Sequence, residues 1–164
     1  MSVLKFENRT PRSLDEMYEY MRDPEKTGGE GMLGIGVNPC APVQEMQFIQ
    51  DIYDREDLAH PYVQVILSFD AGISLELPEL QEMCMEIGQV LIADERQVFG
   101  AIHTLGTDNL HCHYMINYVG MDGALYRQEH HVNYYKRKVN EILKSHGLKP
   151  VKVLVSPPFY IRGY

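Results

Sequence analysis

Three histidines in one short stretch are the residues of this sequence whose types and spacing best suit chemistry. His103, His111 and His113 lie within residues 99–119, where apolar and β-branched runs flank a polar Thr-Leu-Gly-Thr-Asp-Asn connection. That pattern predicts a strand, a loop and a second strand. Side chains alternate along a strand, so His111 and His113 share one face. If the loop folds back as an antiparallel hairpin, the three imidazoles converge on the volume of one metal ion.

Such a cluster predicts a metal site, because imidazole is a common ligand of divalent transition metals. A loop residue, Asp108, either accepts a hydrogen bond from a ligand imidazole and fixes its tautomer, or is an ordinary turn residue, and the two roles are compatible. His60 is a spare ligand. From the residues alone, a zinc-dependent hydrolase with three histidine ligands and an attacking water fits the pattern. So does a non-catalytic binding module whose histidines are structural.

The elements that must position these histidines predict an α+β domain. We expect a central, mainly antiparallel sheet with helices packed chiefly on one face. Helices are expected near residues 13–23, 42–55, 78–93 and 133–146, and strands near residues 2–7, 32–37, 61–69, 99–103, 111–119, 124–127 and 151–155. The face of the second histidine strand that carries Cys112 and Tyr114 is expected to meet the helices. Residues 1–164 suit a single domain, with 156–164 as an irregular tail.

Composition indicates a globular protein without a membrane segment. The chain is 45% hydrophobic and 23% charged, and no apolar run is long enough to span a bilayer. Its three cysteines are scattered without metal-type spacing, which favours reduced thiols in a cytoplasm over a disulfide framework. We therefore expect a cytoplasmic protein.

The net charge of −8 counts against a nucleic-acid partner, because proteins that bind phosphates usually carry a basic footprint. The acidic residues are concentrated in the N-terminal third. The C-terminal third is locally basic, with Lys136, Arg137, Lys138, Lys144, Lys149 and Lys152. A basic face can therefore exist within an acidic chain.

Residues 107–117 read Thr-Asp-Asn-Leu-His-Cys-His-Tyr-Met-Ile-Asn and resemble the third motif of the plasmid mobilisation relaxases. These MobA/VirD2-like enzymes belong to the HUH (His-hydrophobic-His) endonucleases, which have a palm-like fold. In them an upstream histidine completes a three-histidine metal site. The resemblance therefore implies that His103, His111 and His113 hold the metal, and that Asn117 orients a ligand or contacts the phosphate. His103 stands eight residues before His111, one more than the spacing expected in the family.

Two weaker motifs appear in the family's order. Glu19-Tyr20-Met21-Arg22-Asp23 is similar to the first motif, which implies Tyr20 as the nucleophile and Tyr18 as the second candidate. The chain has 11 tyrosines, and each can equally be a packing residue with its hydroxyl at the surface. Leu67-Ser68-Phe69 resembles the second motif, in which the serine approaches DNA. Ser68 is then a substrate contact, or a plain serine at a strand end.

What the resemblance implies is a site- and strand-specific DNA nickase that mobilises a plasmid or conjugative transposon. The tyrosine would attack single-stranded DNA at an origin of transfer and form a 5′-phosphotyrosyl link, which makes the enzyme a transesterase. The divalent metal would be Mg²⁺ or Mn²⁺, with Zn²⁺ as a further option. Accessory relaxosome proteins are the expected protein partners.

Overall fold

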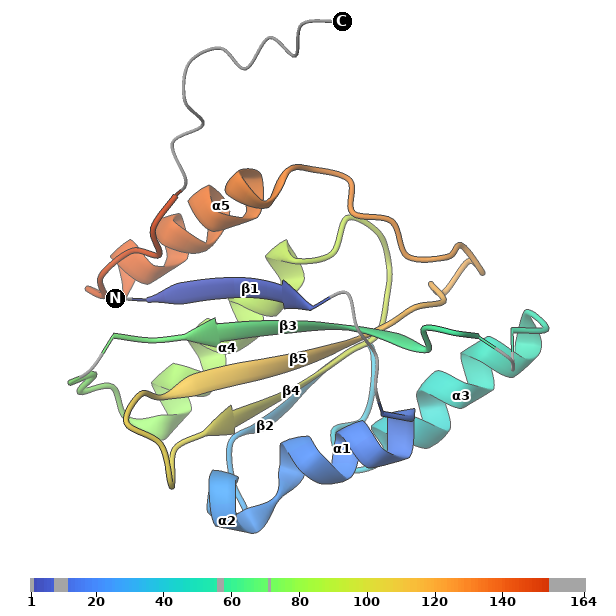
Figure 1. The fold of residues 1–164 in the computed structure, drawn as a ribbon, viewed down its shortest axis with the longest axis horizontal. Coiled ribbons are helices and arrows are strands. Elements are labelled where there is room, and N and C mark those ends of the chain that lie inside the picture. The colour runs from blue at the N-terminus through green and yellow to red at the C-terminus, as the bar shows by residue number, and fades with distance from the viewer. Residues whose placement is uncertain (1, 8–11, 56–57, 71, 154–164) are drawn as a thin grey trace, which may run out of the picture.

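A five-stranded antiparallel sheet forms the centre of the computed structural model, which describes residues 2–7, 12–55, 58–70 and 72–153. The strand order is β1-β3-β5-β4-β2, and every neighbouring pair runs antiparallel (Figure 1). The strands are β1 (Val3–Glu7), β2 (Met32–Ile35), β3 (Tyr62–Ser68), β4 (Val98–His103) and β5 (His111–Asn117). The two strands that carry the histidines are therefore interior, between β3 and the edge strand β2.

Five helices pack on the two faces of this sheet. They are α1 (Leu14–Arg22), α2 (Pro24–Thr27), α3 (Pro42–Ile52), α4 (Leu77–Val90) and α5 (Val132–Ser145). The two longest, α4 and α5, cover one face, while α1 and α3 cover part of the other (Figure 1). The predicted α+β class, with its antiparallel sheet, is confirmed. The partial cover by α1 and α3 adds a second, smaller core on the histidine face.

Alternation along β5 divides its side chains between the two cores. Cys112, Tyr114 and Ile116 are fully buried toward α4 and α5, as the sequence predicts. The Tyr114 hydroxyl donates a hydrogen bond to the carbonyl oxygen of Cys84 in α4, at 2.7 Å. Met115 joins the core on the opposite face. Because both faces of β5 are packed, the strand has little freedom to slip, and its histidines are held in register.

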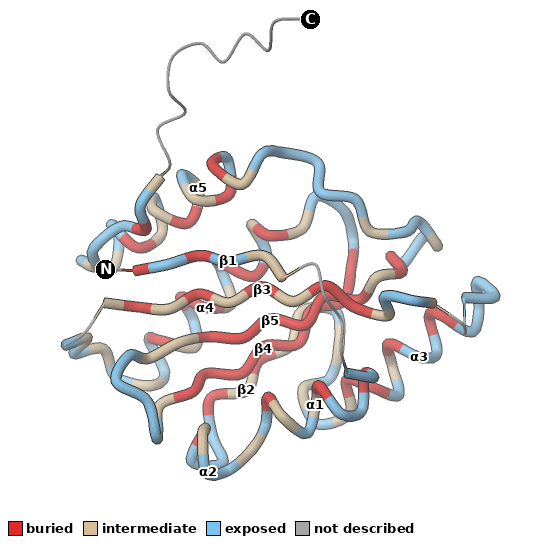
Figure 2. Tube along the Cα trace, in the orientation of Figure 1, coloured by how far each residue is buried: buried red, intermediate tan, exposed pale blue. Residues whose placement is uncertain are grey.

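The β1 and β3 half of the histidine face has no helix over it in Figure 1. Directly paired residues of neighbouring strands lie on one face, and two such rows are Val3–Ser68–His111–His103 and Lys5–Ile66–His113–Ala101. In these rows Val3 and Lys5 are exposed, while Ile66 and Ser68 are half-buried. The histidines therefore lie at the border between a covered half and an open half of the sheet. Figure 2 shows β4 and β5 mostly buried and β1 partly exposed.

Some local expectations were wrong. The short helix α2, which begins at Pro24, was not expected, and a proline is well tolerated at the first helical position. Residues 124–127 form no strand, only an isolated bridge between Leu125 and Val119. Val151 makes a parallel bridge with Ser2, and the predicted tail at 156–164 lies outside the described residues.

No helix of the described residues is long and apolar enough to cross a membrane.

We expect Tyr114→Phe to lower the free energy of unfolding by about 1 kcal/mol, because it removes one buried hydrogen bond and keeps the ring. Urea unfolding followed by circular dichroism measures this change. Tyr134→Phe is the matched control, since that tyrosine lies on α5 with 39% of its surface exposed. Equal stability of the two variants would show that the hydrogen bond from Tyr114 to Cys84 does not stabilise the packing of α4 on β5.

Candidate active site

The hairpin of β4 and β5 brings the three histidines together. His103 and His111 are directly paired across the ladder, so their separation of eight residues is what this register requires. His113 lies two residues further along β5 on the same face. The ring centroids are 4.4 to 5.0 Å apart. One nitrogen of each ring lies within 4.8 Å of those of the other two, which is close enough for one metal ion.

Backbone carbonyls determine which nitrogen of two rings carries hydrogen. His103 Nε2 lies 2.8 Å from the carbonyl oxygen of Met21, and His111 Nδ1 lies 3.0 Å from that of Asn109. A carbonyl oxygen only accepts, so both of these nitrogens are donors. In the neutral rings His103 Nδ1 and His111 Nε2 then present lone pairs to each other across 3.2 Å. Two lone pairs cannot share a hydrogen bond, and a cation between them resolves the conflict.

The third ring points an unpaired nitrogen at the same place. His113 Nε2 is buried and has no hydrogen-bond partner in the described part of the chain. Its Nδ1 lies 3.0 Å from the side-chain amide of Gln64. A half-turn of that amide presents its oxygen to Nδ1–H and leaves Nε2 with a lone pair, and the two amide orientations are nearly isosteric. Gln64 is thus an outer partner of the kind that orients a ligand imidazole.

Burial favours the neutral form of His103 and His113, which is the form that binds a metal. Burial lowers the pKa of His113 to about 3, with further lowering by the neighbouring histidines. Burial also lowers the pKa of His103, against an opposing effect of its hydrogen bond to Met21. Three converging lone pairs, each with a partner on the other ring nitrogen, fit a divalent transition metal.

Helix α1 directs Tyr20 at this cluster. The helix begins at Ser13, whose hydroxyl oxygen accepts from the backbone N–H of Glu16 at 3.2 Å, and it buries Met17 and Met21 against the sheet. That orientation of the helix places the Tyr20 ring centroid 5.9 Å from His103 and 5.6 Å from His113. The geometry therefore brings Tyr20 to the histidines.

Tyr18 lies on a different side of the same helix. Its ring packs edge-on against Phe99, with the centroids 5.2 Å apart. The guanidinium of Arg22 lies 5.3 Å above it. The two candidate nucleophiles, two residues apart on α1, are therefore separated by the body of the helix.

Two cations flank Tyr20 that the sequence analysis did not identify. Arg12 Cζ lies 4.4 Å and Lys26 Nζ 3.7 Å from the Tyr20 ring centroid. The Lys26 carbonyl accepts hydrogen bonds from the N–H groups of Thr104 and Leu105, at 2.9 and 3.0 Å, which tie α2 to the end of β4. The site is therefore locally positive within a chain of net charge −8. These residues flank the recognised motif, so no motif signal pointed to them.

A family model described as the nuclease domain of MobA/VirD2-like relaxases matches residues 20–148, most of the chain. The chain belongs to this family. A solved structure described as the molecular basis of vancomycin resistance transfer in Staphylococcus aureus is similar, with a TM-score of 0.61 and 12% identity. The match covers 94% of this chain and 100% of that one, and at this identity it shows a shared fold. None of the curated proteins compared matches the chain.

On this relaxase domain Ser68 lies beside the histidines. It is the direct partner of His111 in the ladder of β3 and β5, half-buried on the same face and next to the open part of the sheet. Gln64, on the same face of β3, was missed by the sequence analysis. The sequence did contain an indication of this residue. Gln64 is a polar residue between two valines of a buried strand, and its side chain lies on the histidine face.

The structure does not bring Asn117 to the histidines, contrary to expectation. It lies about 13 Å further along β5 than His113, four residues at the usual rise of a strand. Its fully buried Nδ2 donates to Gln97 Oε1 at 2.9 Å and to the Met46 carbonyl at 3.3 Å. Its Oδ1 accepts from Gln50 Nε2 at 3.0 Å. The Asn117 amide therefore joins β5 to α3 and the start of β4.

The expected role of Asp108 also finds no support in the geometry. Asp108 is exposed in the loop between β4 and β5. Among the described residues it makes no hydrogen bond with an imidazole, and the backbone carbonyl of Asn109 occupies that position on His111. The turn interpretation of Asp108 is the one that fits. His60, the spare ligand, lies beside Tyr118 and outside the cluster.

We expect Asn117→Ala to lower the free energy of unfolding by about 3 kcal/mol, because it leaves the buried amides of Gln50 and Gln97 without their partner. Thermal unfolding measures the loss. Below its melting point, the variant should bind Mn²⁺ with unchanged stoichiometry in isothermal titration calorimetry. A stable variant that no longer binds Mn²⁺ would instead place Asn117 in the metal site.

Proposed function

We propose that this relaxase domain nicks and rejoins single-stranded DNA at an origin of transfer, with Tyr20 as the nucleophile. One observation carries the proposal: the Tyr20 ring lies against two of three histidines whose free nitrogens converge on one point. A nucleophile beside a metal site is the arrangement that phosphoryl transfer requires. Tyr18, whose ring lies against Phe99, does not meet this condition.

His103 Nδ1, His111 Nε2 and His113 Nε2 would hold a divalent metal. The family uses Mg²⁺ or Mn²⁺, and three neutral imidazoles bind Mn²⁺ or Zn²⁺ better than Mg²⁺. When bound, the metal supplies a Lewis acid that polarises the phosphoryl oxygens. The outer partners of the rings keep the three lone pairs directed at one point before any ligand arrives.

In the proposed reaction the Tyr20 hydroxyl oxygen attacks phosphorus and passes its proton to solvent water. A Tyr20 O–P bond forms as the bond from phosphorus to the 3′ oxygen breaks, and that oxygen takes up a proton to leave a free 3′-hydroxyl. The product is a 5′-phosphotyrosyl enzyme. Attack by an incoming 3′-hydroxyl reverses the step and rejoins DNA without external energy, because the phosphodiester has been exchanged rather than hydrolysed.

The cations beside Tyr20 would bind the scissile phosphate. The charged groups of Lys26 and Arg12 lie over the Tyr20 ring, and their positive charge would attract a phosphodiester to the atom that attacks it. The open half of the sheet, with Ser68 next to His111 and Lys5 further along the row of His113, would support the DNA strand. We place this activity in plasmid or conjugative-element mobilisation in the cytoplasm, assisted by accessory relaxosome proteins.

Tyr20→Phe is expected to abolish the covalent protein–DNA adduct, because phenylalanine offers no oxygen to phosphorus. The assay incubates the protein with Mn²⁺ and a pool of single-stranded oligonucleotides and then resolves adducts on a denaturing gel. Tyr18→Phe is the matched control and should form the adduct at the rate of the unchanged protein. Loss of the adduct in Tyr18→Phe alone would assign the nucleophile to Tyr18.

His111→Ala and EDTA should each abolish the adduct as well. The substitution removes one of the three proposed metal ligands, and EDTA removes the metal itself. A different result would indicate a zinc hydrolase. The protein would then bind one Zn²⁺ tightly and hydrolyse the oligonucleotides without forming an adduct, and the Tyr20→Phe variant would remain active. Oligonucleotide binding that survives every one of these changes without cleavage would leave a binding module.

Lys26→Met is expected to slow adduct formation on the order of 10- to 100-fold, because one charge beside the attacked phosphate is lost. Its backbone contacts remain, so the melting temperature should change little. Lys26→Arg should recover much of the rate, and Lys144→Met, on the exposed side of α5, should have none of this effect. Single-turnover kinetics measure the rates. An unchanged rate in Lys26→Met would remove Lys26 from the site.

A further inference from the structure

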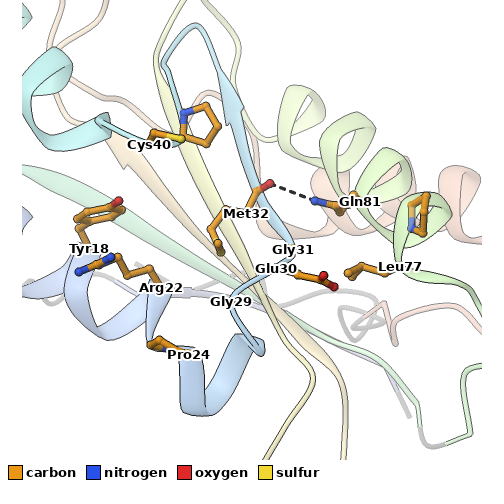
Figure 3. Close-up of a pocket in the computed structure, with 12 residues that line it drawn as sticks. Tyr18, Arg22, Pro24, Gly29, Glu30, Gly31, Met32, Cys40, Leu77 and Gln81 are labelled. Carbon is orange, nitrogen blue, oxygen red and sulfur yellow. Dashed lines mark hydrogen bonds between the residues drawn. The ribbon is translucent and has the colours of Figure 1, made fainter.

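A second concave site lies on the other side of α1, at the edge of the sheet. Its cavity volume is about 820 Å³, within the range of pockets that hold small organic ligands. The walls come from α1 and α2 on one side and from the start of α4 on the other, with the edge strand β2 between them (Figure 3). Tyr18, on one wall, is only two residues from the proposed nucleophile.

One wall of this cavity combines an aromatic ring with a guanidinium. Figure 3 shows Tyr18 and Arg22 together on the side of α1. Arg22 is paired with Glu19 at 2.9 Å, but both side chains are largely exposed, at 46% and 61%. An exposed pair of this kind contributes little free energy, so Arg22 can exchange its carboxylate partner for a phosphate. A ring beside an arginine is a combination that binds a base and its phosphate.

The opposite wall presents acceptors. Gln81 Nε2 donates to the carbonyl oxygen of Met32 at 3.2 Å, which fixes the orientation of the amide and leaves its oxygen as the remaining acceptor (Figure 3). Glu30 adds an exposed carboxylate that lines the same cavity. Carboxylate and amide oxygens accept hydrogen bonds from the exocyclic amino groups of bases, such as N4 of cytosine. The cavity thus has a guanidinium on one wall and hydrogen-bond acceptors on the other.

Two glycines, Gly29 and Gly31, form the backbone between the walls. Gly29 and Gly31 have φ of 79° and 80°, a conformation that residues with a side chain rarely adopt. A Cβ added at Gly29 would have no atom within 4 Å, so this part of the wall faces open space. Backbone rather than side chain lines the cavity here, which allows a planar base to approach closely.

We propose that this cavity binds one nucleotide of the same single-stranded DNA, with its phosphate at Arg22, its base against Tyr18, and the amino group of the base at Glu30 and Gln81. The inference rests on the proposed function for its ligand class. It adds a base preference: cytosine or adenine at this position is favoured over thymine or uracil, because only an exocyclic amino group carries two hydrogens for the two acceptors.

The test compares fluorescein-labelled oligo-dC and oligo-dU of twelve nucleotides by fluorescence anisotropy. These probes differ at the amino-bearing edge of the base and share the same backbone. The protein carries Tyr20→Phe, so no covalent capture interferes. We expect oligo-dC to bind about tenfold more tightly than oligo-dU, a difference equivalent to about 1.4 kcal/mol. Adding Glu30→Met and Gln81→Met, which removes both side-chain acceptors, should bring the ratio of the two dissociation constants close to one.

The measured quantity is the ratio of the dissociation constants for oligo-dU and oligo-dC. Loss of the Glu30 charge by itself would change the affinity for both oligonucleotides equally and leave this ratio unchanged. The matched control adds Gln47→Met and Glu141→Met, both at exposed positions outside the cavity, and should keep the preference. Tyr18→Leu should weaken both probes several-fold. A ratio near one in the protein with intact Glu30 and Gln81, or a ratio that persists after both are changed, overturns the inference.

Failure of the proposed function would look different. If no oligonucleotide gives an adduct with the unchanged protein but oligo-dC keeps its advantage, the nucleotide site stands and the Tyr20 chemistry falls. If adducts form and the Glu30 and Gln81 changes leave the base preference as it was, the Tyr20 chemistry stands and the nucleotide site falls.

Discussion

The direct pairing of His103 with His111 in the ladder of β4 and β5 is the constraint on which the rest of the site depends. It puts two imidazoles side by side at one end of the sheet, and the alternation of β5 adds His113 on the same face. Core packing on both faces of β5 prevents the register from shifting by one residue, which would send both of its histidines to the other side. The arrangement of the three histidines is therefore as stable as the sheet itself.

The second requirement is that α1 lies on the sheet in one orientation. Burial of Met17 and Met21 sets that orientation, and the carbonyl of Met21 also determines the tautomer of His103. One helical turn thus aligns a ligand and places Tyr20 beside it. The same orientation sends Tyr18 to the other side of the helix, where it forms part of a cavity wall.

The acidic chain and its proposed nucleic-acid substrate are reconciled by where the charges lie. Arg12 and Lys26 lie beside the Tyr20 ring, so two cations are close to the histidines. The acidic residues of α1 include Asp15 and Glu16 in its first turn and Glu19, which is paired with Arg22. Phosphate binding responds to local potential at this distance, because charges farther away than about 10 Å are screened by salt. The net charge of the whole chain is a poor guide to such a local surface.

The sequence by itself determined the strand-loop-strand pattern around the histidines, their shared face, the α+β class and the resemblance of the motif at Tyr20, because alternation and motif spacing are local properties. It did not reveal the partners that come from other elements: Gln64 from β3, the Met21 carbonyl from α1, and Lys26 and Arg12 beside Tyr20. It also assigned Asn117 to the site, because a shared strand face says nothing about distance along the strand or about the amides of Gln50 and Gln97 that enclose it. Only the tertiary structure decided these points, since hydrogen bonds and charges between distant segments depend on how helices and strands pack.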